Sequence, residues 1–251
     1  MKGLVGKGMK EGMKKGVKLG IGIGGAILLI IVVVLVKNFS PLLSMNPAET
    51  GYIAGTNILI FKDGVGTMYL IEVDDEYIII DAGTNKAEIE KLLAEYEIDP
   101  MQAAHVFLTH SDSDHVASLE LYENAQIYMS EDELSLLDGT KKRQFFVNNS
   151  LSANIALEDI ILLEDNQELQ IGEHMIQAIK TPGHTIGSMT FILDDQYMFT
   201  GDAFKWENGE FAVHPFSMDR EQSMESIEKI EQLCESEMTL LTSHYGLLLN
   251  R

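Results

Sequence analysis

Residues 109–115 read THSDSDH and place two histidines and two aspartates within six positions. They follow an apolar run at 105–109, which predicts a short buried strand. The four side chains therefore stand where a strand ends, on the kind of loop by which a rigid scaffold presents functional groups. A helix N-cap would account for one aspartate or serine here, but not for two aspartates and two histidines.

Three other predicted strands end in the same way, each with one possible metal ligand. The ligands lie in the segments 181–184 (TPGH), 200–202 (TGD) and 242–244 (TSH). Taken singly, each segment is typical of a turn or a cap. Together the four strand ends supply four histidines and three aspartates, which is enough for two divalent metal ions.

The chain from residue 51 to residue 251 predicts one α/β domain, because no linker composition interrupts it. Strands are predicted at 52–61, 67–73, 77–81, 105–109, 126–129, 160–163, 174–180, 189–193, 197–200 and 240–243. Helices are predicted at 86–96, 119–121, 131–137 and 221–234. Two runs of strands, each followed by helices, favour two sheets packed together with helices outside.

The set of motifs resembles the metallo-β-lactamase superfamily of dinuclear metallohydrolases, over essentially residues 51–245. The family pattern T-H-x-H-x-D-H, P-G-H-T, G-D and S-H has its counterparts at 109–115, 182–185, 201–202 and 243–244. The run 80–83 (IDAG) is similar to the family's Asp-x-Gly, whose aspartate, here Asp81, supports the metal site. The resemblance implies an αββα sandwich that carries a metal-dependent hydrolase.

Carried over by position, the resemblance implies seven ligands for two divalent ions, which would be Zn, Mn or Fe. The first ion would be held by His110, Asp112 and His184, the second by Asp114, His115 and His244, and Asp202 would bridge the two.

Asp112 departs from the family pattern, because it stands where a histidine is usual. A carboxylate is a harder ligand than imidazole, so it shifts the preference from zinc toward manganese or iron. It also makes the ions weaker Lewis acids. Either the site works with Mn²⁺ or Fe²⁺ at a higher pH optimum, or the first site is weak and the enzyme is mononuclear. A similar His-x-Asp-x-Asp-His pattern resembles the hydrolase domain of membrane-bound DNA-uptake channel proteins, so aspartate here is compatible with activity.

The N-terminal residues differ in charge and hydropathy from the rest of the chain. Residues 1–37 hold seven lysines and one acid, whereas the whole chain has a net charge of −21. Residues 19–36 carry no charge and would span ~27 Å as a helix, close to the hydrocarbon thickness of a bilayer. We expect a basic cytoplasmic tail at 1–18, an uncleaved transmembrane anchor at 19–36, a linker at 37–50 and an extracytoplasmic hydrolase domain at 51–251. A cleaved signal peptide is the rival, but no clear A-x-A site follows the apolar run.

Other side chains offer weaker signals. Lys141, Lys142 and Arg143 form the only basic cluster after the anchor, either as a solvated loop or as a group that steers an anionic substrate. His214 could line the pocket. The strongly acidic domain disfavours polymeric nucleic acid as a partner, and a single cysteine, Cys234, excludes an intrachain disulfide.

The first functional hypothesis is attack of a metal-bound hydroxide on an ester, thioester, lactone or lactam, with Asp114 also able to orient the nucleophile. The segment 182–185 favours the general hydrolase branch of the family over its nucleic-acid branch. A phosphodiesterase acting on nucleotides or phosphorylated envelope components is the alternative, which Asp112 favours. A non-catalytic, membrane-tethered metal-binding or sensor protein is the third. The oligomeric state and the particular substrate stay open.

Overall fold

The computed structural model describes residues 27–33, 40–143, 149, 151, 155–234 and 237–248. From Asn46 onward the chain forms one compact unit, and the residues before it are a separate unit. In that first unit, residues 27–33 are helical and Ser40–Ser44 form the 3-10 helix η1. No described helix has both the length and the apolar character needed to cross a membrane. Of the predicted tail and anchor, residues 1–26 and 34–36 lie outside the described residues.

Seven strands form the first sheet, in the order in which they occur along the chain. They are β1 (Gly51–Tyr52), β2 (Ile58–Asp63), β3 (Gly66–Val73), β4 (Glu76–Ile80), β5 (Ala103–Phe107), β6 (Gln126–Ser130) and β7 (Ile161–Leu163). Strands β1 to β4 pair antiparallel, whereas β4 to β7 pair parallel. The carboxyl ends of β4, β5 and β6 therefore meet at one edge of the sheet.

Six strands form the second sheet, in the order β15-β14-β11-β10-β9-β8. They are β8 (Gln167–Ile171), β9 (His174–Lys180), β10 (Met189–Leu193), β11 (Tyr197–Gly201), β14 (Thr239–Thr242) and β15 (Leu247–Leu248). Strands β11 and β14 are parallel, so they also end at a common edge. A separate hairpin pairs β12 (Lys205–Glu207) with β13 (Glu210–Ala212).

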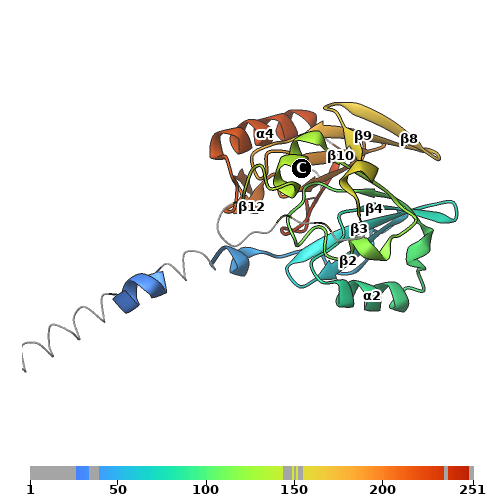
Figure 1. The fold of residues 1–251 in the computed structure, drawn as a ribbon, viewed down its shortest axis with the longest axis horizontal. Helices are drawn as coiled ribbons and strands as arrows, with labels where there is room; N and C mark the ends of the chain where they lie inside the picture. Colours follow the sequence, from blue (N-terminus) through green and yellow to red (C-terminus); the bar gives the residue numbers. More distant parts are fainter. Residues whose placement is uncertain are drawn as a thin grey trace, which may run out of the picture. The chain divides into compact units, whose positions relative to one another are not determined.

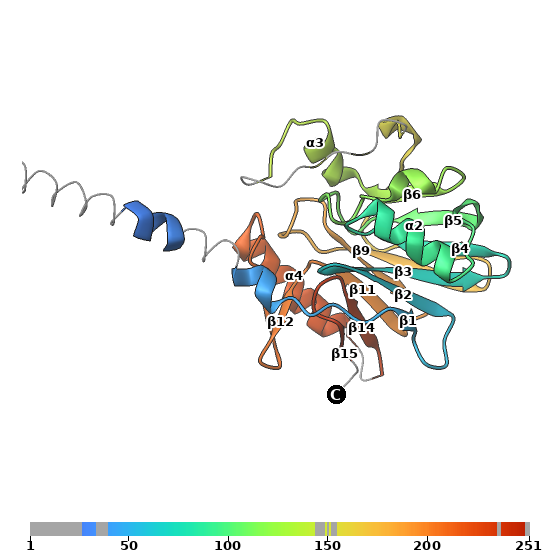
Figure 2. The ribbon, with the colours of Figure 1, turned by 90° about the horizontal axis from the view of Figure 1, so that it is seen from below.

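The two sheets are stacked between two helices, which makes four layers (Figure 1). Helix α2 (Lys86–Glu95) begins at Asn85, whose side chain accepts hydrogen bonds from the first turn, and it covers the first sheet. Helix α4 (Arg220–Leu233) begins in the same way at Asp219 and covers the second sheet. Seen from below in Figure 2, α2 lies over the strands of the first sheet. The αββα arrangement expected from the motif order is the one observed.

Successive side chains point to opposite faces of each strand, and this alternation builds the three apolar layers between the helices and the sheets. In β2, Leu59 and Phe61 pack toward α2, while Ile58 and Ile60 pack between the sheets. This is the side-chain period of a strand that is buried on both faces. Aromatic contacts join the sheets, with the rings of Phe107 and Phe191 5.3 Å apart in an edge-to-face arrangement.

The structure differs from the predicted secondary structure mainly in short elements. The predicted helix at 119–121 is only the 3-10 turn η3 (Leu119–Leu121), and the helix predicted at 131–137 divides into η4 (Glu131–Glu133) and α3 (Leu134–Leu137). The predicted strand 52–61 is interrupted by a turn, so β1 and β2 form a hairpin. Strands β8, β12, β13 and β15 were not predicted, because edge strands and small hairpins bury too few side chains to leave an apolar signal.

Candidate metal centre

The predicted ligands converge at the edge where the strands of both sheets end. His110 follows β5, His184 follows β9, Asp202 follows β11 and His244 follows β14. Two clusters of ligand atoms result, within each of which all the atoms lie within 4.8 Å of one another. We call His110, His184 and Asp202 the first group, and Asp114, His115 and His244 the second group.

Asp202 lies between the two groups. Its Oδ2 is 3.4 Å from Nε2 of His184, and its Oδ1 is 3.3 Å from Nε2 of His244. The two oxygens of one carboxylate thus face a histidine of each group, which is the position expected of a bridging ligand.

The histidines of the second group are held by neighbours that leave Nε2 of both rings without a hydrogen-bond partner. Asp81, at the end of β4, has Oδ2 2.8 Å from Nδ1 of His115 and accepts hydrogen bonds from the amide and hydroxyl of Thr109. The backbone carbonyl of Val65 lies 2.7 Å from Nδ1 of His244. Such partners fix the ring and its tautomer, so that Nε2 is directed at a metal.

One glycine allows the two sheets to approach each other at the site. A Cβ atom on Gly201 would lie 2.5 Å from Oγ1 of Thr109, and Gly201 has a φ of 52°. Any larger residue would force the end of β11 away from the end of β5. In the pair Gly201-Asp202, the glycine therefore allows the close approach of the two strand ends, and the aspartate is the candidate ligand.

The ligand atoms fit a bound cation. Nε2 of His110, His115 and His244 and Oδ1 of Asp202 are buried and have no hydrogen-bond partner. Buried polar atoms are almost always satisfied, so four such atoms converging on one place indicate a ligand position. Imidazole nitrogen and carboxylate oxygen are the donors that zinc and related divalent ions take.

The pKa values of the histidines reflect this concentration of charge. Burial alone would lower the pKa of His115, but the carboxylates of Asp81, Asp114 and Asp202 raise it to about 9. Burial lowers the pKa of His184 to about 4, although Asp202 and Asp112 oppose the shift. His184 is therefore neutral at pH 7 and can offer a lone pair. The second group, by contrast, attracts positive charge.

Asp112 is placed at the first group, but its carboxylate is already engaged. Its Oδ2 accepts a hydrogen bond from Nη2 of Arg143 and lies 3.2 Å from Nε2 of His184, while its Oδ1 accepts one from Nδ2 of Asn149 at 2.8 Å. The side chain of Arg143 is 1% exposed. Of the two interpretations of the basic cluster, the solvated loop is therefore wrong for Arg143 and holds only for the exposed Lys141 and Lys142.

Two residues at the site were missed or only weakly indicated by the sequence. Glu133 is buried and accepts hydrogen bonds from Ser111 with Oε1 and from Thr185 and Gly187 with Oε2. It thereby ties the loop after β5 to the loop after β9. His214 is also buried, with Nδ1 3.1 Å from Nδ1 of His184. Neither residue lies in a recognisable motif.

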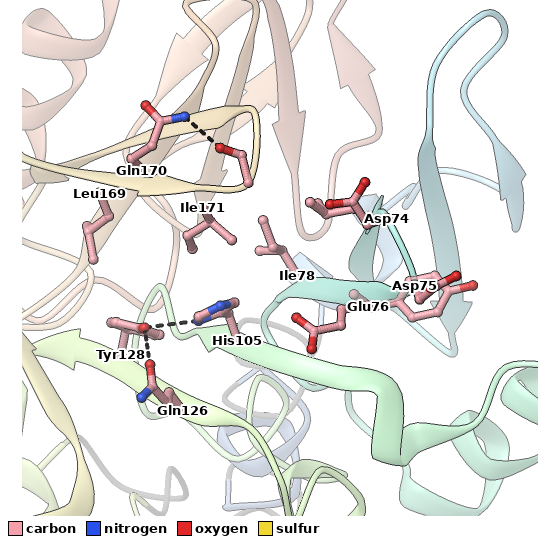
Figure 3. A pocket seen from close by; sticks show the side chains of 13 residues that line it. Asp74, Asp75, Glu76, Ile78, His105, Gln126, Tyr128, Leu169, Gln170 and Ile171 are labelled. Carbon is pink, nitrogen blue, oxygen red and sulfur yellow. Dashed lines mark hydrogen bonds between the residues drawn. The ribbon is translucent and has the colours of Figure 1, made fainter.

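A separate groove of about 670 Å³ lies at the opposite edge of the sheets (Figure 3). Its lining includes the loop before β4, the starts of β5 and β6, and the turn after β8. His105, which belongs to β5 as expected, lies there with Nδ1 3.0 Å from the hydroxyl of Tyr128. None of the seven predicted ligands lines this groove, so size does not identify the reaction site here.

Comparisons with known proteins agree with the fold and with the motifs. A model of the metallo-beta-lactamase superfamily matches residues 62–237, so the chain belongs to that superfamily and is by class a metallo-hydrolase. A probable metallo-hydrolase of Methanocaldococcus jannaschii is 29% identical over 175 residues, 68% of this chain and 72% of its own length. A probable polyketide biosynthesis zinc-dependent hydrolase of Bacillus subtilis is 30% identical over 192 residues, 74% of this chain and 72% of its own length.

Solved structures show the same fold. A metallo-beta-lactamase from Cronobacter sakazakii aligns with a TM-score of 0.61 at 17% identity and covers 79% of this chain and 81% of its own. An archaeal superfamily protein from Sulfolobus tokodaii aligns with a TM-score of 0.53 at 24% identity and covers 74% of this chain and 76% of its own.

Proposed function

We propose that this chain hydrolyses an ester, thioester, lactone or lactam at the site formed by the first and second groups. The observation that carries the proposal is the convergence of four buried, unpartnered ligand atoms on one strand-end edge. A divalent ion bound there would polarise a carbonyl oxygen and lower the pKa of a water molecule. The relative named as a zinc-dependent hydrolase supports zinc among the candidate ions.

Asp114 is the protein group that we assign to orienting the nucleophile. Its side chain is 40% exposed, in contrast to His115 and His244 beside it, so it faces the solvent from which a substrate enters. Burial alone would raise the pKa of Asp114, but the positive potential of His115 and His244 lowers it. A carboxylate that stays ionised accepts a hydrogen bond from water and directs its lone pair, rather than storing a proton.

Charge at the site favours an uncharged acyl group over a phosphodiester. Among the described residues, the basic side chain that reaches the two groups is Arg143, and it is paired with Asp112. The carboxylate of Asp114 faces the opening of the cluster, and that of Asp202 faces its interior. Apart from the bound ion, a negatively charged phosphodiester would therefore find no free basic side chain among the described residues, whereas a neutral carbonyl needs none.

A substrate panel on the metal-depleted chain tests the proposal. After dialysis against a chelator we expect no turnover, and after addition of Zn²⁺, Mn²⁺ or Fe²⁺ we expect hydrolysis of at least one of nitrocefin, an acyl thioester and an acyl lactone. Turnover of bis-p-nitrophenyl phosphate alone would favour the phosphodiesterase. Metal binding without turnover of any of these substrates would favour the binding or sensor protein, and turnover that survives metal removal would contradict all three.

We also propose that the chain is anchored in the cell membrane by residues 19–36, with the tail 1–18 in the cytoplasm and the hydrolase domain outside. The support is the uncharged run itself and the lysines that precede it. We expect the full chain to stay with membranes after an alkaline carbonate wash and to be released by detergent. Release of the chain by carbonate alone would contradict the anchor. A hydrolase domain that an added protease digests only after the cells are lysed would contradict the topology.

A further inference from the structure

The buried side chain of Arg143 lies against the first group. Its Nη2 donates to Oδ2 of Asp112 and lies 3.1 Å from Nε2 of His184. Its Nη1 donates to the backbone carbonyls of His184 and Phe216. A buried guanidinium is costly unless its donors find partners, and here one carboxylate, one imidazole and two carbonyls face Nη1 and Nη2, while Nε has no partner.

The hydrogen bond to His184 uses the lone pair that a metal would need. Nδ1 of His184 faces Nδ1 of His214 at 3.1 Å, and a guanidinium can only donate, so Nε2 of His184 is the acceptor in its contact with Arg143. One lone pair serves either a guanidinium or an ion, but not both. A cation bound beside the guanidinium would also be repelled by it in a buried, weakly screened site.

Among the described residues, no basic side chain contacts the second group in this way. Its ring nitrogens, Nε2 of His115 and His244, have no hydrogen-bond partner, and the neighbouring charges are the carboxylates of Asp114 and Asp202. The balance of charge agrees with this asymmetry. At the first group Arg143 is paired with Asp112, whereas at the second group the carboxylates of Asp114 and Asp202 have no basic side chain beside them among the contacts of the described residues.

We propose that Arg143 is a built-in cation that replaces the ion of the first group, so that the chain binds one divalent ion, at the second group with Asp202. This inference rests on the proposed metal-dependent function. It gives the aspartate at position 112 a role, since this carboxylate holds the guanidinium where the usual histidine would hold a metal. Arg143 is thus a positioning residue that sets the number of ions.

Metal stoichiometry tests the inference without reference to turnover. The full chain, stripped of metal, is titrated with Zn²⁺ and with Mn²⁺ by calorimetry, and the bound metal is measured by elemental analysis. We expect about one equivalent for the wild type and for Arg143→Lys, and about two for Arg143→Gln, which keeps a donor but loses the charge. Lys142→Gln, which removes an exposed positive charge one residue away, is the matched control and should bind about one.

The wild-type titration alone can overturn the inference, even if a variant fails to fold. Two ions of comparable affinity in the wild type would mean that Arg143 leaves the site when metal arrives. One equivalent in a folded Arg143→Gln variant would mean that Arg143 does not determine the count. Binding of no ion by the wild type would overturn the proposed function together with this inference, whereas two ions with intact hydrolysis would overturn the inference alone.

Discussion

Replacing Asp202 with asparagine is expected to lower kcat by on the order of 10³-fold, equivalent to ~4 kcal/mol of transition-state stabilisation. Within the part of the chain that the structure describes, Asp202 is the one residue whose side-chain oxygens face histidines of both groups. An amide keeps the size and the burial of the carboxylate but loses its charge, so it holds a cation poorly and leaves its own N–H donors among ring nitrogens. The fold should survive, because the change is isosteric.

The matched control is Asp195→Asn, which makes the same chemical change away from the site. Asp195 is exposed in the turn between β10 and β11. Turnover with the best substrate of the panel, metal content and thermal unfolding are measured for both variants. We expect Asp195→Asn to match the wild type in all three. Wild-type turnover in a folded Asp202→Asn variant would mean that the reaction does not use this site.

The second large effect is expected on stability, from Glu133→Ala. Its carboxylate accepts from the backbone amides of Ser111 and Gly187 at 2.8 and 3.1 Å and from two hydroxyls, all buried. Removing it leaves these four donors without this acceptor at ~1–3 kcal/mol each, so we expect a loss of at least about 4 kcal/mol in the free energy of unfolding. In a chain of this size that corresponds to a fall in Tm of roughly 10 °C.

Glu131→Ala provides the comparison, because Glu131 lies in the same 3-10 turn, η4, and is exposed. Glu133→Gln should fall between the two, since an amide oxygen replaces only one of the two acceptors. Metal affinity should fall with stability in Glu133→Ala, because the loops that carry His110 and His184 lose their common anchor. A Tm within 2 °C of the wild type, on the order of the shift that 1 kcal/mol produces, would show that the loops hold each other by other contacts.

The fold and the convergence of the candidate ligands could be predicted because both leave local marks in the sequence. Each buried strand gives an apolar run, and each ligand stands just after such a run, so four short segments were enough to locate His110, His184, Asp202 and His244. The helical spacing of apolar residues likewise predicted the ends of α2 and α4 within one or two residues.

The residues that organise those ligands could not be predicted in the same way. Glu133 contacts partners 22 to 54 positions away, and Arg143 contacts partners 31 and 41 positions away, each from a segment without regular periodicity. Nothing in the neighbouring sequence distinguishes them from solvated charges. Burial of a charge becomes visible only when the surrounding donors and acceptors are in place, as they are around Asp112.

The division of the ligands between two sheets links catalysis to the integrity of the whole domain. Asp114 and His115 follow a strand of the first sheet, and His244 follows a strand of the second. An ion bound by all three would therefore link the two sheets. Its binding energy is released only when both halves have docked, and it then adds to the resistance of the protein to heat. Weakening the aromatic contacts between the sheets would therefore lower the affinity for the ion, although those contacts lie far from the residues that touch it.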